Sequence, residues 1–126
     1  MITRWLSTTY LDGGRDYPAV DCWGLVRVAR VDLGYPELPA WGPVKATHKK
    51  SMTRLFGDAI PDLMTETSPK HGAVAFCFHG SVCAHVGVVV IIDGRLAVVD
   101  TNSSTGPRWM WLADFERNFT RVVYYS

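Results

Sequence analysis

The sequence predicts an α+β domain in which N-terminal helices pack on an antiparallel β-sheet. Two segments with helical periodicity occupy the first half of the chain, and short runs rich in Val, Ile and Phe follow in the second half. Helices that precede a block of adjacent strands are typical of the α+β class. The chain has 126 residues, 48% of them hydrophobic, which is enough for one buried core. Residues 1–126 are therefore expected to form a single domain.

The first predicted helix runs from residue 22 to about residue 33. Asp21 precedes it and is a favoured N-cap residue, and Gly34 follows it as a favoured C-terminal stop. The apolar residues at helical spacing are Cys22, Leu25, Val26, Ala29 and Leu33. A loop with two glycines, residues 11–18, is expected before this helix.

A second helix is expected in the segment 41–66, after a short loop. Thr47 is a suitable cap, and Pro61 is expected to end or kink the helix because proline lacks the backbone N–H. The apolar stripe of this helix consists of Met52, Leu55, Phe56 and Ala59.

After Pro69 the apolar pattern becomes that of β-strands. Asp93 and Gly94 form a dipeptide that favours a tight hairpin turn between two of these strands. The predicted strands cover residues 72–78, 84–92 and 95–101, with two more at 106–112 and 120–126.

Composition excludes several classes of function. The formal net charge is +1 and the longest basic cluster is the short stretch 48–50, so nucleic-acid binding is not expected. The sequence lacks an apolar stretch of about 20 residues, so we expect no membrane span. The N-terminus does not resemble a signal peptide, which favours synthesis and retention in the cytoplasm. The three cysteines are an odd number, so at least one is not in an intramolecular disulfide.

Cys22 is the candidate nucleophile. The predicted helix places it in the first turn, where the helix N-terminus favours a thiolate and backbone N–H groups face a developing oxyanion. The alternative is that Cys22 is a small buried side chain that only fills space.

His85 is the candidate general base. It opens an apolar strand, and Gly87 is expected to keep that face of the strand open beside it. An imidazole needs a third polar group to orient it. Asp100 and Asn102 end the neighbouring strand with the same parity, so either one can face His85.

Four stretches of the chain resemble the NlpC/P60 cysteine peptidases: "DCWGLVR…LGYPELP", "HGAVAFC", "HVGVVV" and "DGRLAVVDTN". The stretches "YLDGG…DCWGLVR" and "RLAVVDTNSSTG" resemble the phage tail-assembly branch of that family most. The resemblance implies a reduced papain-like fold. It also implies that Cys22 is the nucleophile, His85 the base and Asp100 the third residue. A supporting tyrosine before the nucleophile matches Tyr10 by spacing, with Tyr17 as the alternative.

The resemblance further implies a substrate and a location. The expected reaction is hydrolysis of peptidoglycan stem peptides between γ-D-glutamate and the diamino acid, without a cofactor. Delivery by a virion tail and contacts with other phage tail proteins are expected from the same resemblance. Two departures stand out: Gly72-Ala73 replaces the usual Gly-Asp, and an aspartate at position 100 replaces the more usual histidine.

Other readings of the sequence stay open. Cys77, His79, Cys83 and His85 could gather around zinc through a hairpin at Gly80-Ser81, although the spacing matches no common zinc module. The chain could also be a structural phage protein that has kept the fold and lost the chemistry. Trp41, Trp109 and Trp111 are candidates for a substrate groove, but such residues more often belong to a core or an interface.

Overall fold

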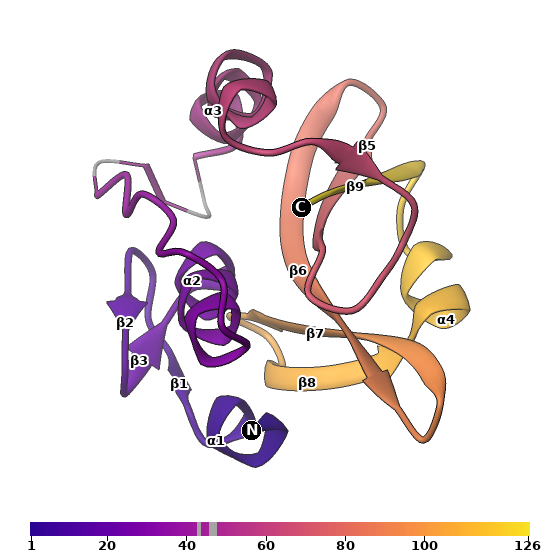
Figure 1. Cartoon of the computed structure of the whole chain (residues 1–126). Coiled ribbons are helices and arrows are strands. Elements are labelled where there is room, and N and C mark those ends of the chain that lie inside the picture. Colours follow the sequence, from indigo (N-terminus) through magenta and orange to yellow (C-terminus); the bar gives the residue numbers. More distant parts are fainter. Residues whose placement is uncertain (43, 46–47) are drawn as a thin grey trace.

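The computed structural model describes residues 1–42, 44–45 and 48–126 (Figure 1). Within these residues the chain folds as an α+β domain with an antiparallel main sheet, as predicted. The helices are α1 (Ile2–Leu6), α2 (Cys22–Asp32), α3 (Lys49–Leu63) and α4 (Leu112–Glu116). The strands are β1 (Thr9–Tyr10), β2 (Arg15–Asp16), β3 (Ala19–Val20), β4 (Glu66–Thr67), β5 (Val74–His79), β6 (Val82–Ile92), β7 (Arg95–Asn102), β8 (Gly106–Trp111) and β9 (Arg121–Tyr125).

The main sheet has six strands in the order β4-β9-β5-β6-β7-β8. All neighbouring strands are antiparallel, and the last strand of the chain, β9, pairs with β5. All five strands expected from the sequence are present. The turn between β6 and β7 is the predicted one, since Asp93 and Gly94 both have positive φ angles, 50° and 77°, as a type I′ hairpin requires.

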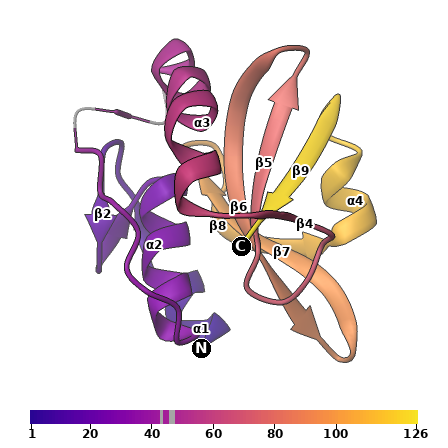
Figure 2. The ribbon, with the colours of Figure 1, turned by 45° about the horizontal axis from the view of Figure 1, so that its top comes forward.

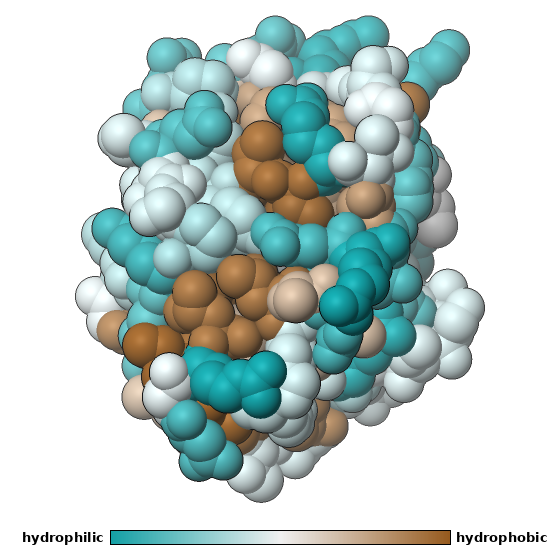
Figure 3. Space-filling model, turned by 90° about the vertical axis from the view of Figure 1, so that its right-hand side faces the viewer, coloured by the Kyte–Doolittle hydropathy of each residue, from teal (hydrophilic) through white to brown (hydrophobic). Residues whose placement is uncertain are grey.

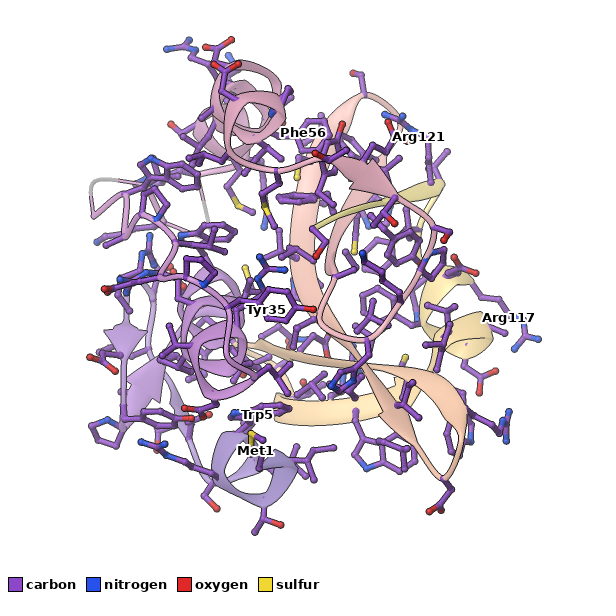
Figure 4. The ribbon with its side chains drawn as sticks, viewed as in Figure 1. Met1, Trp5, Tyr35, Phe56, Arg117 and Arg121 are labelled. Carbon is purple, nitrogen blue, oxygen red and sulfur yellow. The ribbon has the colours of Figure 1, made fainter. Side chains whose placement is uncertain are left out.

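The helices cover the sheet on two sides. In Figures 1 and 2, α2 and α3 lie on one face and the short α4 lies on the other. On the α3 side, the Phe56 ring lies 5.0 Å from the rings of both Phe76 and Phe78 and 5.6 Å from that of Tyr125. Figure 4 shows Phe56 between α3 and the strands. These contacts form part of the larger of two apolar cores.

A second, smaller core lies between the sheet and α4. Phe115 of α4 is fully buried there against Ala75, Cys77 and Val98, whereas Arg117 points away from the sheet (Figure 4). Figure 3 shows apolar residues gathered in the middle of this side of the molecule. The half-buried apolar residues packed against this core are Leu96, Met110, Leu112, Phe119 and Val122.

The two long helices follow the sequence prediction, which leaves open whether Pro61 ends or kinks the second one. α2 begins at Cys22 as expected, and Gly34 follows its end with a φ of 95°. Pro61 does not end α3, which continues to Leu63. Proline removes only the hydrogen bond to the carbonyl of Gly57, and Gly57 is exposed, so water can satisfy that carbonyl. The proposed cap Thr47 lies outside the described residues.

Several short elements were not predicted. These are α1, α4, β4 and a small three-stranded sheet in the order β1-β3-β2. The small sheet includes residues 15 and 16, so the segment 11–18 is not entirely a loop. Among the described residues, no helix is long and apolar enough to cross a membrane.

Candidate active site

The start of α2 is fixed by the buried carboxylate of Asp21. Its Oδ1 accepts a hydrogen bond from the Gly24 N–H at 2.9 Å, which is the predicted N-cap interaction. Its Oδ2 accepts hydrogen bonds from the Gly13 N–H at 3.1 Å and from Arg15 Nη1 at 2.5 Å. Asp21 therefore holds the preceding loop and the first turn together, and Cys22 is the first residue of that turn.

The loop before α2 packs very closely on the helix. A Cβ atom at Gly24 would lie 2.1 Å from the carbonyl oxygen of Gly14, so only glycine fits at position 24. The Gly14 carbonyl also accepts a hydrogen bond from the Asp21 N–H at 3.0 Å. These contacts leave Cys22 little freedom to move relative to the loop that precedes it.

Trp41 belongs to a layer of packed aromatic rings beside this loop. It stacks on Trp23 of α2 with ring centroids 5.0 Å apart, and it borders a narrow apolar cavity of about 30 Å³ that Cys22 also borders. Trp109 and Trp111 form an edge-to-face pair on β8, with ring centroids 4.9 Å apart. The three tryptophans therefore belong to two separate groups.

His85 and Asp100 meet across two neighbouring strands. His85 Nε2 lies 2.7 Å from Asp100 Oδ2, and the Asp100 side chain is completely buried. The β6–β7 pairing runs from Ile92 and Arg95 to Val88 and Val99 and ends there. Beyond that point the two strands are bridged by the side chains of His85 and Asp100.

Gly87 has a different role from the one expected. A Cβ atom there would lie 2.7 Å from Val98 Cγ1 and 3.4 Å from Asp100 Cβ. The space that glycine leaves is therefore filled by side chains of β7 and is not open. Gly87 therefore lets β7 pack closely on β6 at Val98 and at the Val99 carbonyl.

The environment of His85 favours its protonated form. Burial acts to lower the pKa of His85, but hydrogen bonds with Asp100 and with Cys22, together with their negative charges, outweigh burial and raise it to about 9. Because Asp100 occupies Nε2, Nδ1 is the ring nitrogen left for the Cys22 thiol. The three side chains are thus connected in the order cysteine, histidine, aspartate.

A cavity of about 350 Å³ opens beside the thiol. Its lining residues are Tyr10, Cys22, Lys49, His85, Thr101, Asn102 and Ser103. Burial, followed by the negative charges of Asp12, Cys22 and Asp21, raises the pKa of Tyr10 to about 12, so this hydroxyl stays protonated. The Tyr17 hydroxyl instead donates a hydrogen bond to Asp32 Oδ2 at 2.6 Å. Of the two candidate tyrosines, Tyr10 is the one that lines the cavity.

Asn102 also lines the cavity, but its amide oxygen is already used. Asn102 Oδ1 accepts hydrogen bonds from the backbone N–H groups of Ser104 and Thr105, both at 2.9 Å. The side chain therefore shapes the turn between β7 and β8. Between the two residues that sequence parity left open, Asp100 is the one in contact with His85.

The four residues of the zinc alternative do not form one cluster. Cys77 and Cys83 belong to the two different cores on opposite faces of the sheet, and His79 packs on Phe119 with ring centroids 5.2 Å apart. In the described part of the chain, no group of three or more His, Cys, Asp or Glu side chains could hold a metal ion.

Sequence reasoning missed three residues near the site. Arg108 Nε donates a hydrogen bond to Asp100 Oδ1 at 3.1 Å, and Lys49 Nζ donates one to the carbonyl of Ala84 at 2.6 Å. The Thr101 hydroxyl is buried without a hydrogen-bond partner among the described residues. Thr101 lies within the quoted stretch "RLAVVDTNSSTG" and Lys49 within the basic cluster 48–50, but neither pattern indicates a role at this site, and only the strand register would have indicated Arg108.

Comparison with known proteins gives no relative for this chain: no family model, no curated protein and no solved structure matches it. The chemical interpretation therefore rests on the geometry of the chain itself. A thiol at a helix N-terminus that shares a cavity with an imidazole, itself oriented by a buried carboxylate, is an arrangement suited to nucleophilic attack on a carbonyl carbon.

Proposed function

We propose that this chain is a cysteine peptidase with a reduced papain-like fold of the NlpC/P60 type. The observation that carries the proposal is the series Cys22–His85–Asp100: His85 Nε2 lies 2.7 Å from Asp100 Oδ2, and Asp100 and Cys22 together raise the pKa of His85 to about 9 against the effect of burial. The position of Cys22 as the first residue of α2 supports the proposal, because a helix N-terminus favours an anion. The two-layer packing of α2 against an antiparallel sheet agrees with such a fold.

The proposed mechanism has two stages. The Cys22 thiolate attacks the substrate carbonyl carbon, and backbone N–H groups at the start of α2 stabilise the oxyanion. The His85 imidazolium then gives its proton to the leaving amine, and a thioester to Cys22 remains. In the second stage His85 takes a proton from water, the resulting hydroxide attacks the thioester, and the thiolate is regenerated. Asp100 orients the imidazole in both stages.

The proposed substrate is a peptidoglycan stem peptide, cleaved between γ-D-glutamate and the diamino acid. This part of the proposal comes from the resemblance of the "DCWGLV" stretch and the strand motifs to NlpC/P60 peptidases. The same resemblance to phage tail-assembly members suggests that the protein acts at a virion tail, with other tail proteins as partners.

The test is digestion of purified muropeptides from several wall types, followed by mass spectrometry. Wild-type protein is expected to release fragments cut after γ-D-glutamate, and Cys22→Ala is expected to release none. Cys83→Ala is the matched control, because it removes a buried thiol that the mechanism does not use, and it should remain active. Folded, reduced wild-type protein that is inert on every wall type would favour a structural tail protein without peptidase activity.

A further inference from the structure

The buried carboxylate of Asp100 has two partners, and the second is not part of the proposed catalytic series. Oδ2 faces His85 Nε2 at 2.7 Å, while Oδ1 accepts a hydrogen bond from Arg108 Nε at 3.1 Å. Arg108 lies on β8 directly opposite Asp100 in the strand register. Each oxygen of the Asp100 carboxylate therefore contacts a different basic side chain: His85 on β6 and Arg108 on β8, the two strands that flank β7.

A carboxylate with no exposed surface needs such a partner. The Asp100 side chain has an exposed fraction of 0%, whereas that of Arg108 is 36%. A buried carboxylate tends to take up a proton unless charges or hydrogen bonds stabilise its ionised form. The partly exposed guanidinium of Arg108 supplies a positive charge and stays in contact with water. This contact limits the desolvation cost of bringing the two charges together.

The hydrogen bond from Arg108 also fixes the rotation of the carboxylate. With Oδ1 held by Nε, the remaining oxygen is directed at the imidazole. The other groups around this contact do not orient the carboxylate. Cys77 on β5 is a nearby thiol that influences Asp100 only electrostatically. Phe115 on α4 packs an apolar ring against His85, with ring centroids 6.4 Å apart.

We infer that Arg108 is a positioning residue: it holds the Asp100 carboxylate turned toward His85, and it acts on Cys22 only through these two side chains. The inference rests on the proposed function, because it assumes that the Cys22–His85 pair is the reactive unit. It gives the site a fourth member, on an edge strand that does not border the cavity beside the thiol.

A double-mutant cycle tests the inference. The rate of Cys22 alkylation by iodoacetamide is measured from pH 5 to pH 10 in wild type, Arg108→Gln, Asp100→Asn and the double variant, with the modified cysteine identified by mass spectrometry. Near neutral pH, Arg108→Gln is expected to slow alkylation about tenfold, as is typical for the loss of an outer partner that orients a functional group. In the Asp100→Asn background the same substitution is expected to change the rate less than about twofold, because its target is gone.

Arg95→Gln is the matched control. Arg95 lies on the neighbouring strand β7, with its guanidinium over the Trp111 ring at 4.0 Å, so the substitution removes the same charge from the same sheet away from Asp100. Its alkylation profile should match that of wild type. Equal fold-changes for Arg108→Gln in the two backgrounds would overturn the inference, and so would an unchanged rate in Arg108→Gln or an equal loss in Arg95→Gln.

Arg108→Lys keeps the cycle informative if Arg108→Gln does not fold. Lysine retains the charge and removes the Nε donor, so alkylation about threefold slower than wild type is expected with Asp100 present and no change with Asn at that position. A wild-type rate for Arg108→Lys would contradict the orienting role. The measurement needs no substrate. If wild-type Cys22 reacts no faster than a cysteine of the unfolded chain, the proposed function fails. If Cys22 is reactive but the effects of the Arg108 and Asp100 substitutions on its rate are additive, only the role assigned to Arg108 is contradicted.

Discussion

Replacing Asp100 by Asn removes the negative charge that faces His85 and leaves a side chain of the same shape. His85 has a raised pKa of about 9 although burial acts to lower it, because the hydrogen bonds and charges of Asp100 and Cys22 outweigh burial. A hydrogen bond to a charged group is worth about 1.5–3 kcal/mol. Since a tenfold change in proton affinity is about 1.4 kcal/mol, Asp100→Asn is expected to lower the pKa of His85 by about one to two pH units.

The assay is an NMR titration of the His85 ring. At pH 8 a group with a pKa of about 9 is about 90% protonated, and after the expected fall it is roughly 10–50% protonated. Asn102→Ala is the control, because the Asn102 amide oxygen accepts hydrogen bonds from the turn after β7. The reasoning is refuted if Asp100→Asn leaves the titration of His85 unchanged, or if Asn102→Ala lowers the pKa of His85 by more than Asp100→Asn does.

The same pKa predicts how stability depends on pH. The folded state holds the His85 proton more tightly than the unfolded state, whose histidine has a pKa of about 6.5. The stabilising contribution is therefore complete below pH 6.5, decreases as the pH rises, and is lost above about pH 9. It amounts to roughly 3 kcal/mol of unfolding free energy. Urea unfolding at pH 6 and pH 10 should show a smaller difference in Asp100→Asn than in wild type.

The other two predictions concern the thiols and the tyrosines. Iodoacetamide should modify Cys22 before the other two cysteines near neutral pH, because burial raises the pKa of Cys77 strongly and that of Cys83 to about 12. Peptide mass spectrometry detects which cysteine is modified. Faster modification of Cys77 or Cys83 in the folded protein would contradict the assignment of Cys22 as the nucleophile. Tyr10→Phe should lower the rate of stem-peptide cleavage without changing thermal stability, whereas Tyr17→Phe should leave the rate unchanged and cost roughly 1–3 kcal/mol in urea unfolding, because it removes the hydrogen bond to a carboxylate.

The parts of the fold that the sequence predicts are those whose signal spans several residues. α2 has eleven residues between a capping aspartate and a glycine with positive φ, and each long strand is an apolar run between turns. The missed elements are too short for any period: α1 and α4 have five residues each, and β1 to β4 have two. Such elements form because neighbouring segments offer hydrogen bonds, and a local pattern does not contain that information.

The candidate site shows the same division. Parity along β7 leaves both Asp100 and Asn102 as possible partners of His85. Only the family resemblance favours Asp100, because the local pattern does not show that the turn after β7 uses the Asn102 amide. Arg108 was not found for a related reason. Its contact with Asp100 follows from the register of β8 against β7, and register is set by the turn and by packing.

The end of the β6–β7 pairing at Val88 and Val99 has an evolutionary consequence. Position 100 lies just beyond the ladder between these strands but within the β7–β8 ladder, directly opposite Arg108, so an exchange of its side chain acts on that residue across the sheet. Arg108 limits the exchange, because its guanidinium is matched to a carboxylate at position 100. A descendant that acquires an uncharged acceptor or a histidine there is expected to lose the arginine as well. Positions 100 and 108 should therefore change as a pair, and a collection of related chains would show them co-varying.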